Sequence, residues 1–150
     1  MNLYLLEKQL AEGEGSPPAT YLDSKGILTG GIGHNLIDEP EHGFDKPGIP
    51  VPPEMRTKWF LKDIQDALDD LNINAPWWKT LDDVRQNALL DLCFNMGWLG
   101  LSTFHNSLAA LMNGNYTAAA YGIKHSQYAK DVGPLRSSRI AYMIEFGEWT

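Results

Sequence analysis

Glu14 and Asp23 are the residues of this 150-residue sequence whose types and spacing could perform chemistry. They lie nine positions apart with turn residues between them, and Thr29 follows Asp23 by six positions. Two carboxyl groups are sufficient to hydrolyse a glycosidic bond, because a protonated one donates to the leaving oxygen while an ionised one activates water or attacks the sugar. A hydroxyl group beside the ionised carboxylate can hold the attacking water. The trio therefore predicts a site that cleaves sugar chains.

The two carboxyl groups of such a site need different surroundings. An apolar or crowded setting keeps the acid protonated, whereas the base stays ionised where it is wet or hydrogen-bonded. A glutamate at a helix end and an aspartate at a strand end can meet both requirements. The spacing alone favours a simpler explanation, because nineteen acidic residues produce many pairs and most such pairs are solvated surface groups.

The segment before Asp23 predicts a helix that ends at the candidate acid. Residues 2–13 place three leucines on one helical stripe. Pro17 and Pro18 then prevent the helix from continuing. Glu14 is therefore expected at the C-terminal end of this helix. Glu12 is a competing candidate for the acid, but side chains two positions apart face different sides of a helix, so only one of the two can face a common site.

The segment around Asp23 predicts a β-hairpin. Residues 21–23 and 27–32 have the composition of two short strands, and Ser24-Lys25-Gly26 forms the loop between them. Gly26 occupies the loop position where a positive φ is expected. Three further glycines, at positions 30, 31 and 33, indicate a bulge or a close approach by another group. They do not form a dinucleotide-binding motif, because no helix follows them at the required spacing.

The rest of the chain predicts one loop followed by helices. Residues 35–53 are rich in proline and are expected to form either a flap over the site or a solvated connection. Residues 54–73 predict a long amphipathic helix. Thr80 and Asp83 form a capping signal for a buried helix that Gly97 ends. Further helices are expected over 103–113, 116–125 and 134–146.

This pattern predicts an α+β fold within a single domain, residues 1–150. We expect a small lobe with the hairpin, over about 14–53, and a linking helix over about 54–73. The larger, all-helical lobe is expected to comprise about 74–150 together with 1–13. The single cysteine, Cys93, lies in an apolar helical pattern that favours a buried, unreactive thiol.

Charge and hydropathy limit the classes of partner. A formal net charge of −7 argues against a nucleic-acid-binding protein, which needs a basic face. No apolar run is long enough for a membrane span. The first ten residues lack the basic and apolar regions of a signal peptide, so we expect synthesis in the cytoplasm. We expect a monomer that needs neither a cofactor nor a metal.

The most specific motif of the chain is E-G-x5-Y-x-D-x2-G-x2-T-x-G-x-G-H over residues 14–34. In this motif the chain resembles the phage-type lysozymes of glycoside hydrolase family 24. Later motifs follow in the order that the family has, and the resemblance covers almost the whole chain. These motifs are L-D-x-V-R at 81–85, F-N-M-G at 94–97, F-x-N-S-L at 104–108, G-P-L-R-S-S-R at 133–139 and G-E-W at 147–149.

The resemblance implies a lysozyme-like fold and a role for each member of the trio. Glu14 would be the general acid, Asp23 the general base or electrostatic partner, and Thr29 the residue that positions the water. The resemblance also implies an inverting enzyme. The two carboxyl groups are therefore expected to be roughly 6.5–9.5 Å apart, rather than the about 5–5.5 Å of retaining enzymes.

Several other residues receive expectations from the resemblance. His34 is expected to be structural rather than a base and to pair with Asp63 of the long helix. Arg136 is the preferred partner for Glu14, ahead of Arg139, and a surface ion pair is the alternative. Possible sugar-binding residues are Asn95, Asn106 and Ser107.

The activity implied by the resemblance is hydrolysis of the β-1,4 bond between N-acetylmuramic acid and N-acetylglucosamine in bacterial peptidoglycan. Without a signal peptide, the enzyme would need a membrane-permeabilising protein (a holin) to reach the wall from the host cytoplasm. Two alternatives remain open: a lytic transglycosylase, which needs only one catalytic glutamate, and a wall-binding module without catalysis.

Overall fold

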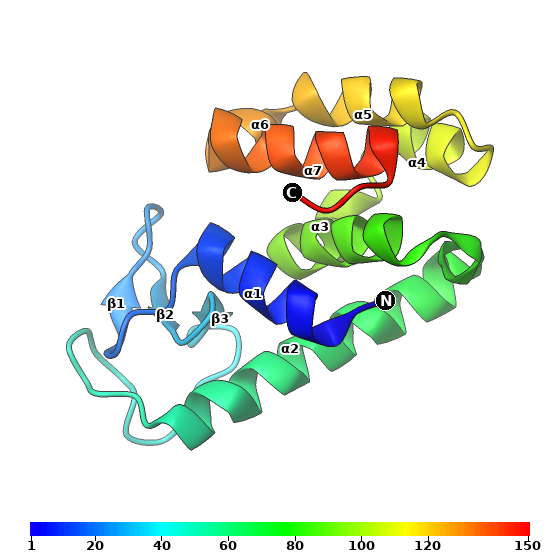
Figure 1. Cartoon of the computed structure of the whole chain (residues 1–150). Helices are drawn as coiled ribbons and strands as arrows, with labels where there is room; N and C mark the ends of the chain where they lie inside the picture. Colours follow the sequence, from blue (N-terminus) through cyan, green and yellow to red (C-terminus); the bar gives the residue numbers. More distant parts are fainter. The chain divides into compact units, whose positions relative to one another are not determined.

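The segment that carries the candidate site folds into a short helix and a small antiparallel sheet. Helix α1 spans Leu3–Glu14, and strands β1 (Tyr21–Leu22), β2 (Leu28–Gly30) and β3 (His34–Asn35) follow in the order β1-β2-β3 (Figure 1). The predicted hairpin is therefore present, and Gly26 has the expected positive φ of +77°. Strand β3 was not predicted, and it extends the hairpin to a third strand by pairing with β2.

The computed structural model describes all residues, 1–150, and the remainder of the chain is helical. Helix α2 is the long helix predicted over 54–73, and a short 3₁₀ helix, η1, follows it. The predicted α+β class is confirmed. The helical elements are α2 (Pro53–Asn74), η1 (Pro76–Thr80), α3 (Asp83–Leu101), α4 (His105–Met112), α5 (Tyr116–Lys124), α6 (Gln127–Val132) and α7 (Pro134–Phe146).

The chain divides into two compact units. One unit comprises residues 7–66, and the other comprises residues 1–6 together with 67–150. Both boundaries fall inside helices, within α1 and within α2. Most of α1 therefore belongs to the unit that holds the sheet. The predicted division into two lobes and a linking helix stays a prediction. Glu14, Asp23 and Thr29 all belong to the unit of residues 7–66.

A small apolar core supports the sheet. Trp59 of α2 is 2% exposed, and an added Cβ at Gly30 would lie only 2.7 Å from its ring. Glycine at position 30 therefore lets the central strand approach the indole closely, which explains one of the three glycines at positions 30, 31 and 33. The buried residues of this core are Leu28, Leu36, Val51 and Trp59, with Phe44 and Met55 packed against them.

The proline-rich loop is fastened to the segment that precedes β1. Thr20 exchanges backbone hydrogen bonds with the loop, since its amide donates to Ile49 O at 2.8 Å and its carbonyl accepts from Gly48 N at 2.8 Å. Its buried hydroxyl donates to Lys46 O at 2.6 Å and accepts from Ile49 N at 2.9 Å. A bridge between Ala19 and Pro50 continues this pairing. The second half of the loop is thus held by a ladder of hydrogen bonds rather than being a free connection.

Helix α3 differs from its prediction at both ends. Its N-cap is Asp82, whose carboxylate accepts from Arg85 N, whereas the predicted cap, Thr80, donates its hydroxyl to Trp77 O in η1. At the other end Gly97 does not stop the helix but kinks it, with φ +67° and ψ 170°, and helical structure resumes to Leu101.

The buried thiol predicted inside α3 is present. Cys93 is 2% exposed, and burial raises the pKa of its thiol to about 12, with the charge of Asp70 adding to the effect. A thiol with so high a pKa is almost entirely protonated at neutral pH and is a poor nucleophile.

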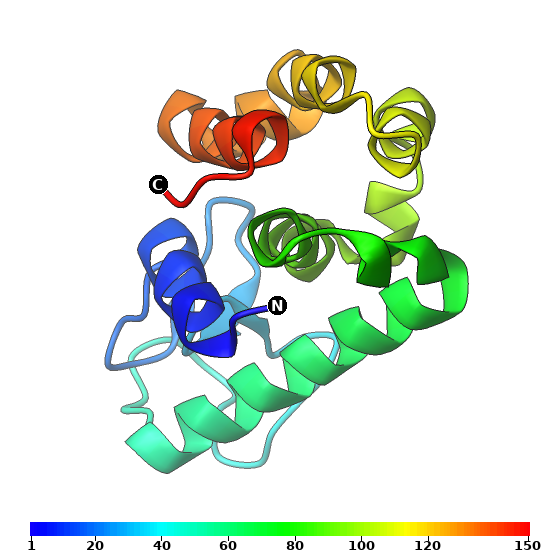
Figure 2. The same ribbon diagram turned by 45° about the vertical axis from the view of Figure 1, so that its right-hand side comes forward.

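The second half of the chain forms a packed group of helices. Helix α5 packs against α4 and α7, which lie beside it in Figure 2. Arg85 of α3 donates to the carbonyl oxygens of Ile144 and Glu145, at 2.7 and 2.9 Å, and so satisfies carbonyls at the C-terminal end of α7. Helix α6 was not predicted. None of the helices has the length and apolar character that a membrane crossing requires.

Candidate active site

Glu14 is the last residue of α1 and lies against the turn between β2 and β3. Gly15, with φ +76°, ends the helix at this point. An added Cβ at Gly33 would lie 3.2 Å from both Cδ and Oε2 of Glu14, so the carboxyl group packs directly on the backbone of Gly33. The side chain is partly buried. A helix end and a glycine of the β2–β3 turn thus position the candidate acid together.

Asp23 is fixed by the hairpin loop that it helps to form. Its Oδ1 accepts hydrogen bonds from Lys25 N at 2.8 Å and from Ile27 N at 2.9 Å. Its amide donates to Ile27 O at 2.9 Å. These bonds fix the position of the carboxyl group at the end of β1. Both side-chain bonds use Oδ1, which leaves Oδ2 to accept from a water or a sugar.

Thr29 lies in the central strand, directly opposite Tyr21. It is 4% exposed, and its hydroxyl donates to Ile27 O at 2.8 Å. Because the proton is used in this bond, the oxygen is oriented to act toward other groups as an acceptor. A water that donates to Thr29 would present a lone pair away from it. The predicted role in positioning water stays a prediction.

The side chain of Tyr21 is affected by the charges of both candidate carboxylates. Burial raises the pKa of its phenol, and the negative charges of Glu14 and Asp23 raise it further. Both carboxylates therefore lie within electrostatic reach of one side chain, which also pairs across the sheet with Thr29. Sequence reasoning gave Tyr21 no role, although the residue is part of the most specific motif. The structure thus gathers the predicted trio around a fourth residue.

The Tyr21 phenol can be used to measure this proximity. Glu14→Gln removes the charge that affects Tyr21 more strongly, so we expect the pKa of Tyr21 to fall toward its ordinary value, and Asp23→Asn to lower it less. The pKa would be followed by ultraviolet absorbance or by NMR, with Tyr21→Phe identifying the signal. Glu7→Gln, at an exposed position of α1, is the matched control. An unchanged Tyr21 titration in Glu14→Gln would place Glu14 away from the sheet.

Gly33→Ala is expected to disturb Glu14. The new methyl group would lie 3.2 Å from the carboxyl group, and a φ of +65° adds backbone strain of about 1–2 kcal/mol for a residue with a Cβ. Gly26→Ala is the control for strain alone, because its φ is +77° and an added Cβ meets nothing within 4 Å. We expect similar losses of stability but a larger loss of activity in Gly33→Ala. Equal activities of the two variants would contradict the contact with Glu14.

The expected contact between His34 and Asp63 is present. His34 is 3% exposed, and its Nδ1 lies 2.8 Å from Asp63 Oδ2. The imidazole also stacks on Trp59 with ring centroids 4.9 Å apart and an interplanar angle of 10°. The ring is thus held between the core and α2, a position that suits a structural histidine better than a general base.

The remaining predicted residues lie in the other unit. Arg136 donates from Nη2 to the buried Asp91 at 2.9 Å. Its predicted pairing with Glu14 would join the two units and stays a prediction. Ser107 is buried in α4, with its hydroxyl directed at Gly122 of α5, so it packs inside the helical unit. Asn106 is exposed at the start of α4, and Asn95 is partly buried in α3. Sugar binding by these three residues also stays a prediction.

Comparison with known proteins gives the family. The phage lysozyme family model matches residues 11–137. The chain belongs to the phage lysozyme family, and its fold is lysozyme-like. This membership supports a lysozyme-like glycoside hydrolase that acts on peptidoglycan.

Three relatives show how this domain occurs elsewhere. The chain is similar to the probable T4-type lysozymes 1 and 2 of Dictyostelium discoideum, at 26% and 28% identity over 95% of the chain and 94% of each relative. It is also 26% identical, over 95% of its length, to the pre-baseplate central spike protein Gp5 of Enterobacteria phage T4. It spans only 28% of that spike protein, so the resemblance concerns one part of a longer chain.

Proposed function

We propose that the protein is a muramidase that hydrolyses the β-1,4 bond between N-acetylmuramic acid and N-acetylglucosamine in bacterial peptidoglycan. The observation that carries the proposal is the grouping of Glu14, Asp23 and Thr29 around Tyr21 within one compact unit. Membership of the phage lysozyme family supports the same chemistry.

Each member of the trio has a role that its local geometry suits. Glu14 donates a proton to the glycosidic oxygen as the bond breaks. Asp23, held by two backbone amides through Oδ1, uses Oδ2 to take a proton from the attacking water or to stabilise the positive charge that develops on the sugar. Thr29 holds that water by accepting one of its hydrogen bonds. An inverting reaction follows if the water attacks from the face opposite the leaving group.

The biological setting that fits this activity is lysis of a bacterial host by a phage or prophage. In this setting the enzyme acts as a monomer on the cell wall and reaches it from the host cytoplasm after a holin has opened the membrane. The similarity to the T4 spike protein favours a second setting, in which the same domain is part of a tail structure and acts on the wall from outside. The chemistry is the same in both.

A lytic assay on permeabilised bacteria tests the proposed activity. We expect purified protein to reduce the turbidity of Gram-negative cells whose outer membrane has been removed, and to release soluble wall fragments. A protein that sediments with isolated peptidoglycan but releases no fragments would instead be a wall-binding module, and the proposal would fail. A protein that does neither would also contradict it.

A further inference from the structure

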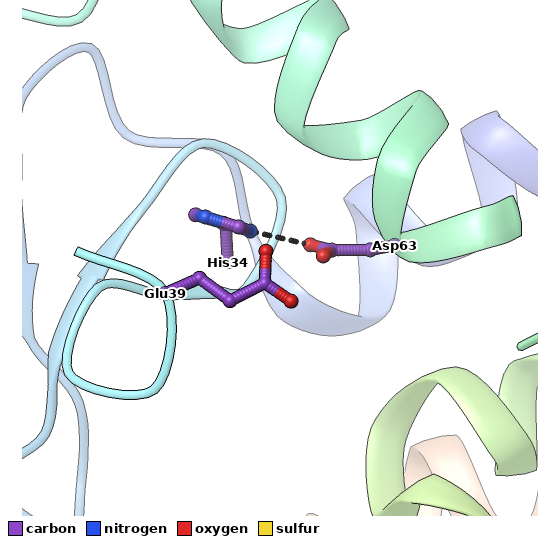
Figure 3. A group of neighbouring side chains, drawn as sticks. All are labelled: His34, Glu39 and Asp63. Atoms are coloured by element: carbon purple, nitrogen blue, oxygen red, sulfur yellow. Dashed lines mark hydrogen bonds and ion pairs between the residues drawn. The ribbon is translucent and has the colours of Figure 1, made fainter. Parts of the chain in front are cut away.

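His34, Glu39 and Asp63 form a group of potential metal ligands on the unit of residues 7–66. One ligand atom from each residue lies within 4.8 Å of the other two. Figure 3 shows the three side chains converging from separate segments, with the imidazole and both carboxylates directed toward one another. None of the three was assigned a ligand-binding role in the proposed reaction.

Each of the three side chains is held in place by the fold. His34 is fixed by its stacking on Trp59 and by the pairing of β3 with β2. Glu39 follows a tight turn in which its amide donates to Asn35 O at 3.1 Å, while Asn35 Oδ1 accepts from Ile37 N and Asp38 N. Asp63 is on the regular part of α2. The site is therefore built on ordered backbone, which metal sites require.

The donor set selects a class of ion. One imidazole nitrogen with two carboxylate oxygens suits zinc and related transition metals, whereas magnesium and calcium prefer oxygen ligands alone. With three protein ligands, the fourth position of a tetrahedral zinc ion is left to a water. The 2.8 Å between His34 Nδ1 and Asp63 Oδ2 must widen by about half an ångström for both atoms to bind one ion at zinc distances of about 2.0–2.2 Å. The wider separations in the group, which reach up to 4.8 Å, must shorten by a rotation of the Glu39 side chain. The partial exposure of Asp63 and Glu39 leaves an entry route.

We propose that His34, Glu39 and Asp63 bind a zinc ion, or a divalent transition metal of similar preference, and that this ion fastens the end of β3 to α2. The role is structural and is separate from the reaction attributed to Glu14 and Asp23. A metal was not predicted from the sequence, because the three residues belong to no recognisable ligand motif.

A metal ion at this site must compete with a neighbouring lysine for Glu39. Lys62 Nζ donates to Glu39 Oε1 at 2.8 Å and to Asp66 at 2.7 Å. The ion therefore competes with this ammonium for Glu39, which can still use its second oxygen. Asp66 can still accept the hydrogen bond from Lys62 when Glu39 binds the ion. The neighbouring acids outnumber the neighbouring lysines, which favours a cation. The charged groups that these contacts place at the site are Glu39, Asp63 and Asp66 against Lys62.

Zinc titration of metal-free protein tests the proposal. Isothermal calorimetry should show one zinc ion per chain, and magnesium at the same concentration should give no heat of binding. With free zinc at about a hundred times its dissociation constant, the unfolding midpoint should rise by about 5–10 °C. Failure to bind zinc at 100 μM would overturn the proposal.

Paired variants identify the ligands. Loss of a group that only supports a ligand already costs about 10–100-fold in metal affinity, so Glu39→Gln should weaken zinc binding at least about 10-fold. Asp63→Asn should do the same while keeping an acceptor for His34. Glu41→Gln is the matched control, because Glu41 contacts Lys58 and is outside the group. Undiminished binding by Glu39→Gln would show that zinc sits elsewhere, for example on Cys93 or another histidine, and would refute the site.

Discussion

Glu14→Gln is expected to remove nearly all lytic activity while leaving the protein folded. The amide has the shape of the carboxylic acid and can keep the same contact with Gly33, but it cannot donate a proton to the leaving oxygen. Loss of general acid catalysis should reduce the rate by about 10²–10⁴-fold. The rate would be measured on purified peptidoglycan, with circular dichroism and denaturant unfolding as tests of the fold.

Two companion variants test whether the loss of activity is specific to the proposed catalytic residues. Asp23→Asn should also lose most activity, because it keeps the loop hydrogen bonds through Oδ1 but loses the negative charge. Glu12→Gln removes a neighbouring exposed carboxylate from the same helix and should retain full activity. If Glu14→Gln keeps more than a tenth of the wild-type rate, Glu14 is not the proton donor.

Trp59→Ala is expected to produce the largest loss of stability. The indole is 2% exposed, stacks on His34 and meets the edge of Phe44 at a centroid distance of 5.1 Å. Replacing a buried tryptophan by alanine costs about 3–5 kcal/mol, a large share of the roughly 5–15 kcal/mol that usually holds a domain together. Because this core supports the sheet that carries Asp23 and Thr29, activity should fall as well. Denaturant unfolding measures the change.

Two other tryptophan variants act as controls. Trp59→Phe should cost less, because phenylalanine keeps an aromatic ring and the Nε1 of Trp59 has no hydrogen-bond partner to lose. Trp149→Ala, at a position 42% exposed, should change stability by no more than about 0.5 kcal/mol. A Trp59→Ala protein as stable as Trp149→Ala would contradict the role of the indole as the centre of this core.

The sequence predicted the elements whose ends are marked by local signals. Helix α7 starts at Pro134 and ends before Gly147, as proline and glycine at those positions indicate. Helix α2 extends one residue beyond its predicted range at each end. These boundaries depend on backbone preferences of a few adjacent residues, which can be judged without knowledge of the tertiary structure.

The elements that were missed depend on contacts made at a distance or on very short segments. Strand β3 is two residues long and exists because it pairs with β2 across a glycine turn. Helix α6 has six residues, too few to show a helical period, and its start depends on a cap by Ser126. Thr80 had the right residue type for a cap, but its hydroxyl is used inside η1 and Asp82 caps α3 instead.

The residues of the candidate site were predicted from the sequence, but their arrangement in space was not. The motif named Glu14, Asp23 and Thr29, yet spacing could not show that Tyr21 lies within reach of both acids. The same holds for Glu39, which joins His34 and Asp63 only because the turn after β3 brings it back toward α2. Proximities of this kind arise from the fold and leave no periodic signal in the chain.

Analysis of the chain ends released from purified peptidoglycan tests the proposed hydrolysis most directly. If two carboxylates deliver water to the sugar, every cut should leave a reducing N-acetylmuramic acid end, which borohydride converts to the alditol and mass spectrometry detects. Products that end in 1,6-anhydro-N-acetylmuramic acid would show that no water is added, and the assignment of Asp23 and Thr29 would be wrong.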